Sequence, residues 1–280
     1  MIPNVLFEDY INTTFIDRNN ASLLIPIGVN QQGVLEQVEI TDKHWQHVLV
    51  AGHAGSGKSN YLHTVLTSLL LNYSAEQLNI WLSDSGMYEF NRFAKHAPAQ
   101  IKQINTSSEP TSYIAFVDAL EEEINKRIQC LAKMGRTSYY SCVTESENCP
   151  FPRLMVVLDC FDHVIRDLSK INRDYVEKFD NAVRYASACG ITFLVSTQEA
   201  LFLAQQINRR FFESFGIRIA TKQSLDSYSI LFDNSAARLV QDFKLGEAIV
   251  NTQGVHKVKL LYLADSIEDD IIKTVYSKST

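Results

Sequence analysis

The sequence has few cysteines, few glycines and prolines, and no long apolar run. Its five cysteines form no CxxC pair and no Cys/His cluster with zinc spacing, and their odd number disfavours a disulfide framework. Eleven glycines and six prolines in 280 residues are too few for a long linker. No stretch reaches the ~18 apolar residues of a membrane span, and the N-terminus lacks the basic start and apolar core of a signal peptide. These absences indicate a reducing, cytosolic setting.

An excess of positive charge is also missing from the sequence, although a local basic patch remains possible. Its 26 lysines and arginines stand against 32 aspartates and glutamates, for a formal net charge of −6. Because nucleic-acid binding draws its energy from clustered Lys and Arg side chains, a nucleic-acid partner is not expected. The hydrophobic content of 46% is ample for a sizeable core, so the sequence predicts a folded globular protein.

Apolar segments of two periodicities alternate along the chain. Short strands are expected over 22–50, and the last of them, HVLVAG, comes directly before a glycine-rich loop. Helical spacing follows over 58–71, 113–134 and 174–188, while QLNIWLSDS, LMVVLD, GITFLVSTQ and GIRIAT are typical of buried strands. Strands separated by such helices pair in parallel, with helices on both faces of the sheet. The sequence therefore predicts an α/β fold with a mainly parallel central sheet and short flanking strands.

The glycine-rich loop GHAGSGKS satisfies the pattern G-x-x-x-x-G-K-[ST] in full. Its glycines let consecutive backbone N–H groups curl around phosphate oxygens, Lys58 supplies a charge for the β- and γ-phosphates, and the Ser59 hydroxyl is a ligand for Mg²⁺. Since a strand precedes the loop and a helix follows it, the sequence predicts a nucleotide site. The residues expected to hold the nucleotide are Gly52, His53, Ala54, Gly55, Ser56, Gly57, Lys58, Ser59 and Asn60.

The simplest organisation is one domain over residues 1–280. Its parts are a lead-in of short strands (1–46), a P-loop core (47–250), and a closing hairpin with a tail (251–280). The hairpin is expected to turn near Gly254. No internal repeat or low-complexity segment indicates a further division.

The apolar strand LMVVLD ends in Asp159, which is the expected catalytic carboxylate and the second Mg²⁺ ligand beside Ser59. A second carboxylate normally follows such an aspartate, but this chain has Cys160, and a neutral thiol cannot act as a base. Such a base typically contributes about 10²- to 10⁴-fold to the rate, so nucleotide binding is a stronger expectation than hydrolysis. Asp162 is an alternative base, although it would have to swing around a turn to reach the water.

Gln198, at the end of the segment VSTQ, is a further candidate catalytic residue. Ligands of open α/β sheets bind outside the carboxyl ends of the strands, where a glutamine side chain could sense a γ-phosphate. The alternative is that Gln198 simply caps its strand as a satisfied polar residue.

Several dispersed motifs between about Ile25 and Val250 resemble, in the same order, those of the FtsK/SpoIIIE family of P-loop ATPases. They are IPIGV, HVLVAGHAGSGKSN, LSDSGMYEF, HAP, VVLDCF, STQ and IRIATKQSLDSYSIL. The resemblance implies a RecA-like P-loop NTPase fold, ATP with Mg²⁺ as cofactors, and assembly in tandem or as a ring. The compact length and acidic balance are more similar to a C-terminal ATPase module of EssC/EccC, the type VII secretion motor, than to a DNA translocase, whose winged helix is not expected here.

The resemblance to EssC/EccC modules also implies partners and a location. The partners would be neighbouring ATPase modules of the same polypeptide or ring, and small secreted helical proteins. The location would be the cytoplasmic face of the bacterial cell membrane, as a soluble domain of a larger membrane protein. Membrane contact would come only through a segment absent from this chain.

Three positions depart from the family pattern. Cys160 stands at the Walker B glutamate, Tyr228 at the arginine of the DSRTIL stretch, and Gly86 at a lysine often found after the second strand. An arginine finger alone typically contributes about 10³- to 10⁵-fold to the rate. Beside an intact phosphate loop, these losses favour a module that binds ATP, hydrolyses it weakly or not at all, and regulates the motor or recruits its substrates.

Two other functions remain open from the sequence. One is an active DNA translocase motor of the FtsK/SpoIIIE type, against which the acidic composition argues. The other is a nucleotide-independent protein-binding scaffold, whose binding surface would lie in the polar loop expected over 136–152. The Tyr139, Tyr140 and Phe151 side chains are apolar for a surface segment, and they either meet a partner or pack back onto the core.

Overall fold

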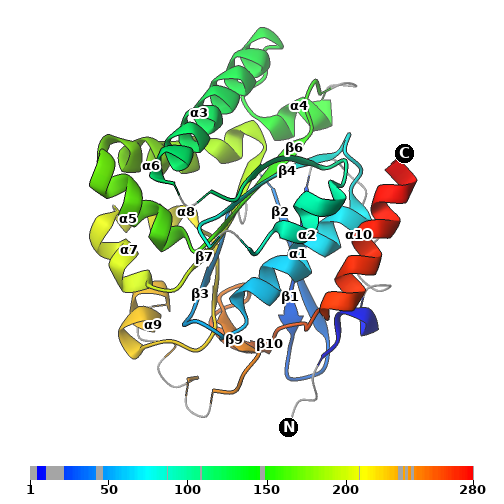
Figure 1. Ribbon diagram of the computed structural model, residues 1–280, viewed down its shortest axis with the longest axis vertical. Coiled ribbons are helices and arrows are strands. Elements are labelled where there is room, and N and C mark those ends of the chain that lie inside the picture. The colour runs from blue at the N-terminus through cyan, green and yellow to red at the C-terminus, as the bar shows by residue number, and fades with distance from the viewer. Residues whose placement is uncertain are drawn as a thin grey trace.

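The computed structural model describes residues 5–10, 22–41, 47–86, 88–107, 109–145, 149–207, 209–232, 236, 239–240 and 243–279. Within these residues ten strands form one sheet, in the order β2-β1-β10-β9-β8-β3-β7-β6-β4-β5 (Figure 1). Neighbouring strands pair in parallel from β8 (Ile217–Ala220) through β3 (Val48–Ala51), β7 (Ile191–Thr197), β6 (Arg153–Asp159) and β4 (Leu78–Asp84) to β5 (Ile101–Asn105). The predicted α/β fold with a mainly parallel sheet is confirmed.

The remaining described strands are antiparallel and extend one side of the sheet. They are β1 (Leu23–Val29), β2 (Leu35–Ile40), β9 (Glu247–Val250) and β10 (His256–Lys259). In the turn between β1 and β2, Asn30 Oδ1 accepts hydrogen bonds from the backbone N–H groups of Gln32 and Val34, both at 3.0 Å. Asparagine commonly closes turns in this way. Because β9 pairs with β8, the flank continues the parallel sheet and does not form a second layer.

Helices cover both faces of the sheet (Figure 1). Their bounds are α1 (Lys58–Asn72), α2 (Asn91–His96), α3 (Pro110–Lys133), α4 (Tyr139–Glu145), α5 (Phe161–Ile171), α6 (Asp174–Ala186), α7 (Ala200–Gln206), α8 (Arg209–Ser214), α9 (Leu225–Phe232) and α10 (Asp265–Ser279). No helix in the described ranges has both the length and the apolar content that a membrane crossing needs.

Alternate residues of the central strands pack on opposite faces. In β6, Leu154, Val156 and Leu158 belong to the apolar cluster with α3, α5 and α6, whereas Met155 and Val157 belong to the cluster with α1. All five side chains are at most 1% exposed. A strand that is buried on both faces is apolar at every position, which explains the continuous apolar run in the sequence.

Besides the predicted helices α1, α3 and α6, the described residues form seven more, of which α4 and α10 lie where a loop and a tail were expected. α4 occupies part of 136–152, which was expected to be a polar loop, because a mostly polar helix of seven residues leaves little periodic signal. Its Tyr139 is 1% exposed and packs against Gly190, while Tyr140 and Phe151 are partly buried. The alternative in which these aromatic residues pack back onto the core is therefore correct. α10 lies in the expected tail and packs against α1 and α2.

The buried guanidinium of Arg127 links α3 to the segments that contain Pro152 and Cys189. Its side chain is 2% exposed, and it donates hydrogen bonds to the Glu123 carboxylate at 2.7 Å and to the carbonyls of Pro152 and Cys189 at 2.9 and 3.1 Å. The guanidinium also lies 4.6 Å from the ring centroid of Phe151. Acceptors removed from water need a donor, so this cation satisfies several groups at once.

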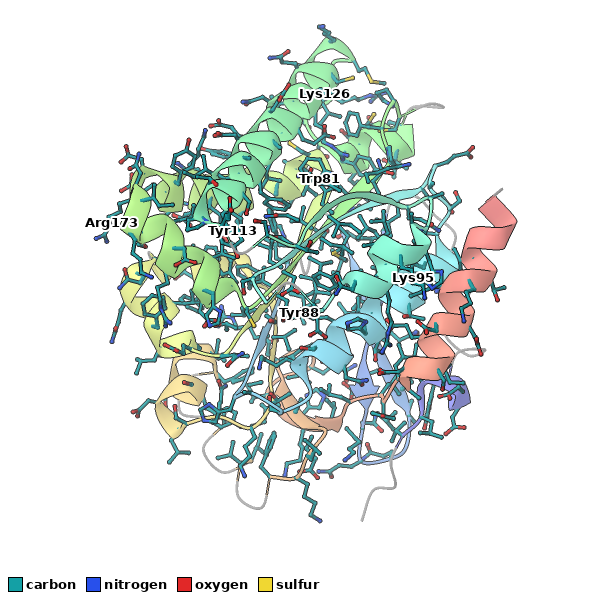
Figure 2. The ribbon with its side chains drawn as sticks, in the orientation of Figure 1. Trp81, Tyr88, Lys95, Tyr113, Lys126 and Arg173 are labelled. Atoms are coloured by element: carbon teal, nitrogen blue, oxygen red, sulfur yellow. The ribbon has the colours of Figure 1, made fainter. Side chains whose placement is uncertain are left out.

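Replacing Arg127 with methionine is expected to lower the free energy of unfolding by about 2–4 kcal/mol, because it leaves one carboxylate and two carbonyls without their donor. Urea denaturation followed by circular dichroism measures the change. Lys126→Met is the matched control, since Lys126 lies on the same helix with 79% of its side chain exposed (Figure 2). The control should change stability by no more than about 0.5 kcal/mol. Equal effects of the two substitutions would contradict the role of Arg127.

Candidate functional site

The phosphate loop joins β3 to α1 and is held at its start by the neighbouring strands. The backbone N–H of Gly52 donates to the carbonyl of Thr197 at the end of β7 (3.1 Å), and that of His53 donates to the carbonyl of Lys222, just beyond β8 (2.9 Å). A Cβ at Gly52 would lie 1.8 Å from Thr221 Oγ1, so only glycine fits without displacing that side chain. The loop therefore leaves the sheet at one fixed point between the carboxyl ends of parallel strands.

The rest of the loop fits the phosphates of a nucleotide. Gly55 and Gly57 have φ angles of 71° and 101°, which residues with a side chain rarely adopt, and Gly57 directs the first N–H groups of α1 toward an anion. The Lys58 ammonium donates to the carbonyl of His53 at 3.0 Å. Burial lowers the pKa of Lys58, although nearby acidic groups, including Asp159, oppose this shift. A phosphate here would balance the buried cation.

A cavity of about 200 Å³ opens beside the loop. The Ser56 hydroxyl lies 2.6 Å from that of Thr221, so Ser56 faces the end of β8. Two lysines and two apolar side chains on the far wall give the cavity a composition suited to the nucleoside part of a nucleotide. The lining residues are His53, Ala54, Gly55, Ser56, Lys222, Phe243, Lys244 and Leu245.

The two side chains predicted to hold Mg²⁺ lie at this edge of the sheet. Ser59 is in the first turn of α1, and Asp159 ends β6 with only 4% of its surface exposed. Burial raises the pKa of Asp159, and the hydrogen bond that its Oδ1 accepts from the Ser196 hydroxyl only partly offsets this shift. A divalent cation would stabilise the buried charge. The donor set suits Mg²⁺, which Ser59 and Asp159 would hold and which would offset the charge of the phosphates.

Cys160 begins α5 in a left-handed conformation, with a φ of 51°. Its backbone N–H donates to the Ser196 hydroxyl at 2.9 Å, and the Gln198 amide Nε2 donates to its sulfur at 3.4 Å. Burial, and next the charge of Asp159, raises the pKa of the Cys160 thiol to about 12, so the thiol is protonated at neutral pH. The predicted sensor Gln198 thus contacts the residue at the position of the missing carboxylate.

Asp162 packs against the end of β7. Its carboxylate is fully buried, and its Oδ1 accepts hydrogen bonds from the Thr197 hydroxyl at 2.9 Å and from the backbone N–H of Gln198 at 3.0 Å. These bonds fix the end of β7. The buried Oδ2 has no hydrogen-bond partner among the described residues, so the role of Asp162 as a base in place of Cys160 stays a prediction.

Two residues singled out in the sequence connect elements around the site. The Asn60 side chain donates to the carbonyl of Leu263 at 2.7 Å and accepts from its N–H at 3.3 Å, which links α1 to the segment before α10. A nucleotide would therefore meet only the backbone of Asn60. Tyr228, at the family arginine position, is 2% exposed and donates its hydroxyl to the carbonyl of Thr221 at 2.8 Å. It packs α9 against the end of β8.

A polar network that the sequence did not reveal lies behind Ser59. His63, one turn further along α1, lies 2.5 Å from Glu268 Oε1 on α10 and 3.0 Å from Glu89 Oε1. Arg92 of α2 pairs with the other oxygen of Glu268 at 2.7 Å. Glu89 could have been found from the sequence, because it belongs to the family motif LSDSGMYEF. His63 and Glu268 could not, because they are 205 positions apart and match no local pattern.

The charges of this network are coupled. Burial alone would lower the pKa of His63, but hydrogen bonds with Glu268 and Glu89 outweigh it and raise the pKa to about 9. The pKa of Glu89 is lowered, first by its hydrogen bond with His63 and further by one with the Ser59 hydroxyl, against the effect of burial. At neutral pH the cluster therefore holds an imidazolium between two carboxylates.

Comparison with known proteins finds a matching family and similar folds. The model of the FtsK/SpoIIIE family matches residues 9–264. The chain is 31% identical over 201 residues to the ESX-3 secretion system protein EccC3 of Mycobacterium tuberculosis, which covers 65% of this chain and 14% of EccC3. Its fold resembles the cytoplasmic domain of the Thermomonospora curvata type VII secretion ATPase EccC, with a TM-score of 0.76, 23% identity, and coverage of 95% of this chain and 32% of that one.

A second structure of T. curvata EccC, containing ATPases 2 and 3 in complex with a signal sequence peptide, is also similar. The TM-score is 0.69 at 17% identity, and the match covers 94% of this chain and 47% of that one. At these identities the structural likeness concerns the fold, and it confirms the predicted P-loop ATPase architecture. The chain spans only part of the length of each of these relatives.

The charged His63 predicts a pH dependence of stability. Its pKa is about 9 in the folded chain and near 6.5 when unfolded, so its contribution is complete below pH 6.5 and is lost as the pH rises through 9. Since each unit of pKa difference corresponds to about 1.4 kcal/mol, the free energy of unfolding should fall by a few kcal/mol over this window. Urea denaturation at a series of pH values measures the fall. An equal fall in His63→Gln would contradict the charged state of His63.

Proposed function

Because the chain belongs to the FtsK/SpoIIIE family, we propose that it is an ATP-binding module of a type VII protein-secretion ATPase in which hydrolysis is weak or absent. One observation carries this proposal: a phosphate loop that fits a nucleotide stands beside a protonated thiol, Cys160, where a carboxylate base would be needed. The similarity to EccC and EccC3 supports a secretion ATPase or translocase module, with residues 1–280 as one domain.

Each residue of the proposed site has a distinct task. Lys58 and the loop backbone bind the phosphates, while Ser59 and Asp159 would hold Mg²⁺. Gln198 would sense the γ-phosphate through the contact that its amide makes with Cys160. Since a protonated thiol stands where the base would be, ATP would act mainly as a ligand that stabilises one state of the module by mass action.

The proposed partners are neighbouring ATPase modules of the same polypeptide or ring, and small secreted helical proteins. The similarity to an EccC structure that contains two ATPases and a signal sequence peptide supports both. The module would regulate the motor or recruit its substrates at the cytoplasmic face of the membrane. Another segment of the complete protein would provide the membrane attachment.

Lys58→Ala is expected to abolish ATP binding, because it removes the cation that pairs with the β- and γ-phosphates. Thermal unfolding with ATP and Mg²⁺ measures binding, which at a ligand concentration of 100 times Kd stabilises a protein by about 2.7 kcal/mol. Wild-type turnover should exceed that of Lys58→Ala by less than tenfold. Fast turnover that is lost in Asp162→Asn would contradict weak hydrolysis. No binding by the wild type would support a nucleotide-independent scaffold.

Cys160→Glu is expected to raise ATP turnover at least tenfold, because it restores a carboxylate at the position of the base, a group typically worth about 10²- to 10⁴-fold. A phosphate-release assay measures the rate. Cys160→Gln, which has a similar size and no charge, is the control and should leave turnover unchanged. The same assay with duplex DNA tests the translocase alternative, which requires DNA-stimulated turnover that falls steeply with salt.

A further inference from the structure

The Glu89 carboxylate lies over the first turn of α1, next to the predicted Mg²⁺ ligand Ser59. Ser59 and His63 are four positions apart on α1 and so share one face of the helix. His63 Nε2 lies 3.0 Å from Glu89 Oε1, which places this carboxylate on the helix face that Ser59 shares. Asp159 ends β6, the neighbour of β4 in the sheet, so Glu89 and Asp159 follow adjacent parallel strands.

Asp84 fixes the turn that carries Glu89. It ends β4 directly beside Asp159 in the strand register and is 1% exposed. Its two carboxylate oxygens accept hydrogen bonds from the backbone N–H groups of Gly86 at 2.6 Å and of Glu89 at 2.7 Å. A Cβ at Gly86 would lie 3.2 Å from Asp84 Oδ1, so glycine allows the turn to close tightly. Asp84 therefore shapes the turn, and Glu89 is the carboxylate that the turn presents.

Glu89 is also more exposed to solvent than the three aspartates that lie near the phosphate loop. Its side chain is 31% exposed, whereas Asp84, Asp159 and Asp162 are buried. The His63 imidazole holds this partly exposed carboxylate in place, which suits it to accept a hydrogen bond from a metal-bound water.

We propose that Glu89 contributes to Mg²⁺ binding at the nucleotide site, where its carboxylate accepts a hydrogen bond from a Mg²⁺-bound water. The same carboxylate supplies a negative charge that the chain lacks at Cys160. This inference rests on the proposed binding of ATP with Mg²⁺. Mg²⁺ is commonly held by one or two protein groups plus phosphates and keeps several waters, which leaves a place for such an acceptor. His63 is a positioning residue, held from the other side by Glu268.

Glu89→Gln tests the proposal because it removes the charge and nearly keeps the shape of the side chain. ATP affinity is measured by isothermal titration calorimetry in Mg²⁺ and again in EDTA. The measured quantity is the factor by which Mg²⁺ raises the affinity for ATP. We expect this factor to be at least tenfold smaller in the variant than in the wild type, while the affinity of the variant in EDTA stays within about twofold of the wild type. Glu122→Gln, which removes an exposed carboxylate on α3, is the charge-matched control and should behave as the wild type.

An unchanged Mg²⁺ gain in Glu89→Gln would overturn the role of Glu89 and leave the proposed function in place. No ATP binding by the wild type would instead overturn the proposed function. If Glu89→Gln fails to fold, Glu89→Asp keeps the charge and shortens its reach, and a full Mg²⁺ gain in that variant would equally overturn the proposal. Glu268→Gln should reduce the gain by a smaller factor while unfolding stays cooperative, and a full gain there would overturn the positioning by His63.

Discussion

The position of the whole site depends on two backbone hydrogen bonds, from Gly52 and His53 to the ends of β7 and β8. They can form because β3 lies between parallel partners, with Val48 opposite Leu194 on one side and Ile217 on the other. The carboxyl ends of parallel strands meet at one edge of the sheet, which brings the phosphate loop, the end of β6 and the turn after β4 together. Helices pack on both faces of these strands, so the side chains of each strand contribute to two apolar clusters.

The features that could be predicted from the sequence are those with a local signal. The phosphate loop, the apolar run of β6 and the helical spacing of α1 and α3 each lie within one short window, and they were sufficient for the fold and the nucleotide loop. The contact between His63 and Glu268 has no such signal, because it joins two elements at opposite ends of the chain. The orientation of Asp162 depends on the left-handed backbone of Cys160 and on hydrogen bonds with β7, which no spacing of residue types encodes.

The thiol at Cys160 also has an electrostatic effect on the folded chain. Asp159 and Asp162 are both buried within three residues of each other, and a glutamate at Cys160 would add a third negative charge between them. Like charges at close range disfavour the ionised forms, so a neutral side chain lowers the cost of burying the two aspartates. Under the proposed function, weak hydrolysis and a lower cost of burying the two aspartates are both effects of Cys160, a common relation between stability and activity.

The contacts that support the first turn of α1 span nearly the whole chain. His63 and Glu268 are 205 positions apart, and Asn60 and Leu263 are 203 positions apart. Contacts of such separation form only after the chain between them has become ordered. During synthesis from the N-terminus, the phosphate loop leaves the ribosome long before residue 268 does. The phosphate loop can therefore be fixed once β7 and β8 have been made, whereas Asn60 and His63 lack these partners until residues 263–268 have followed.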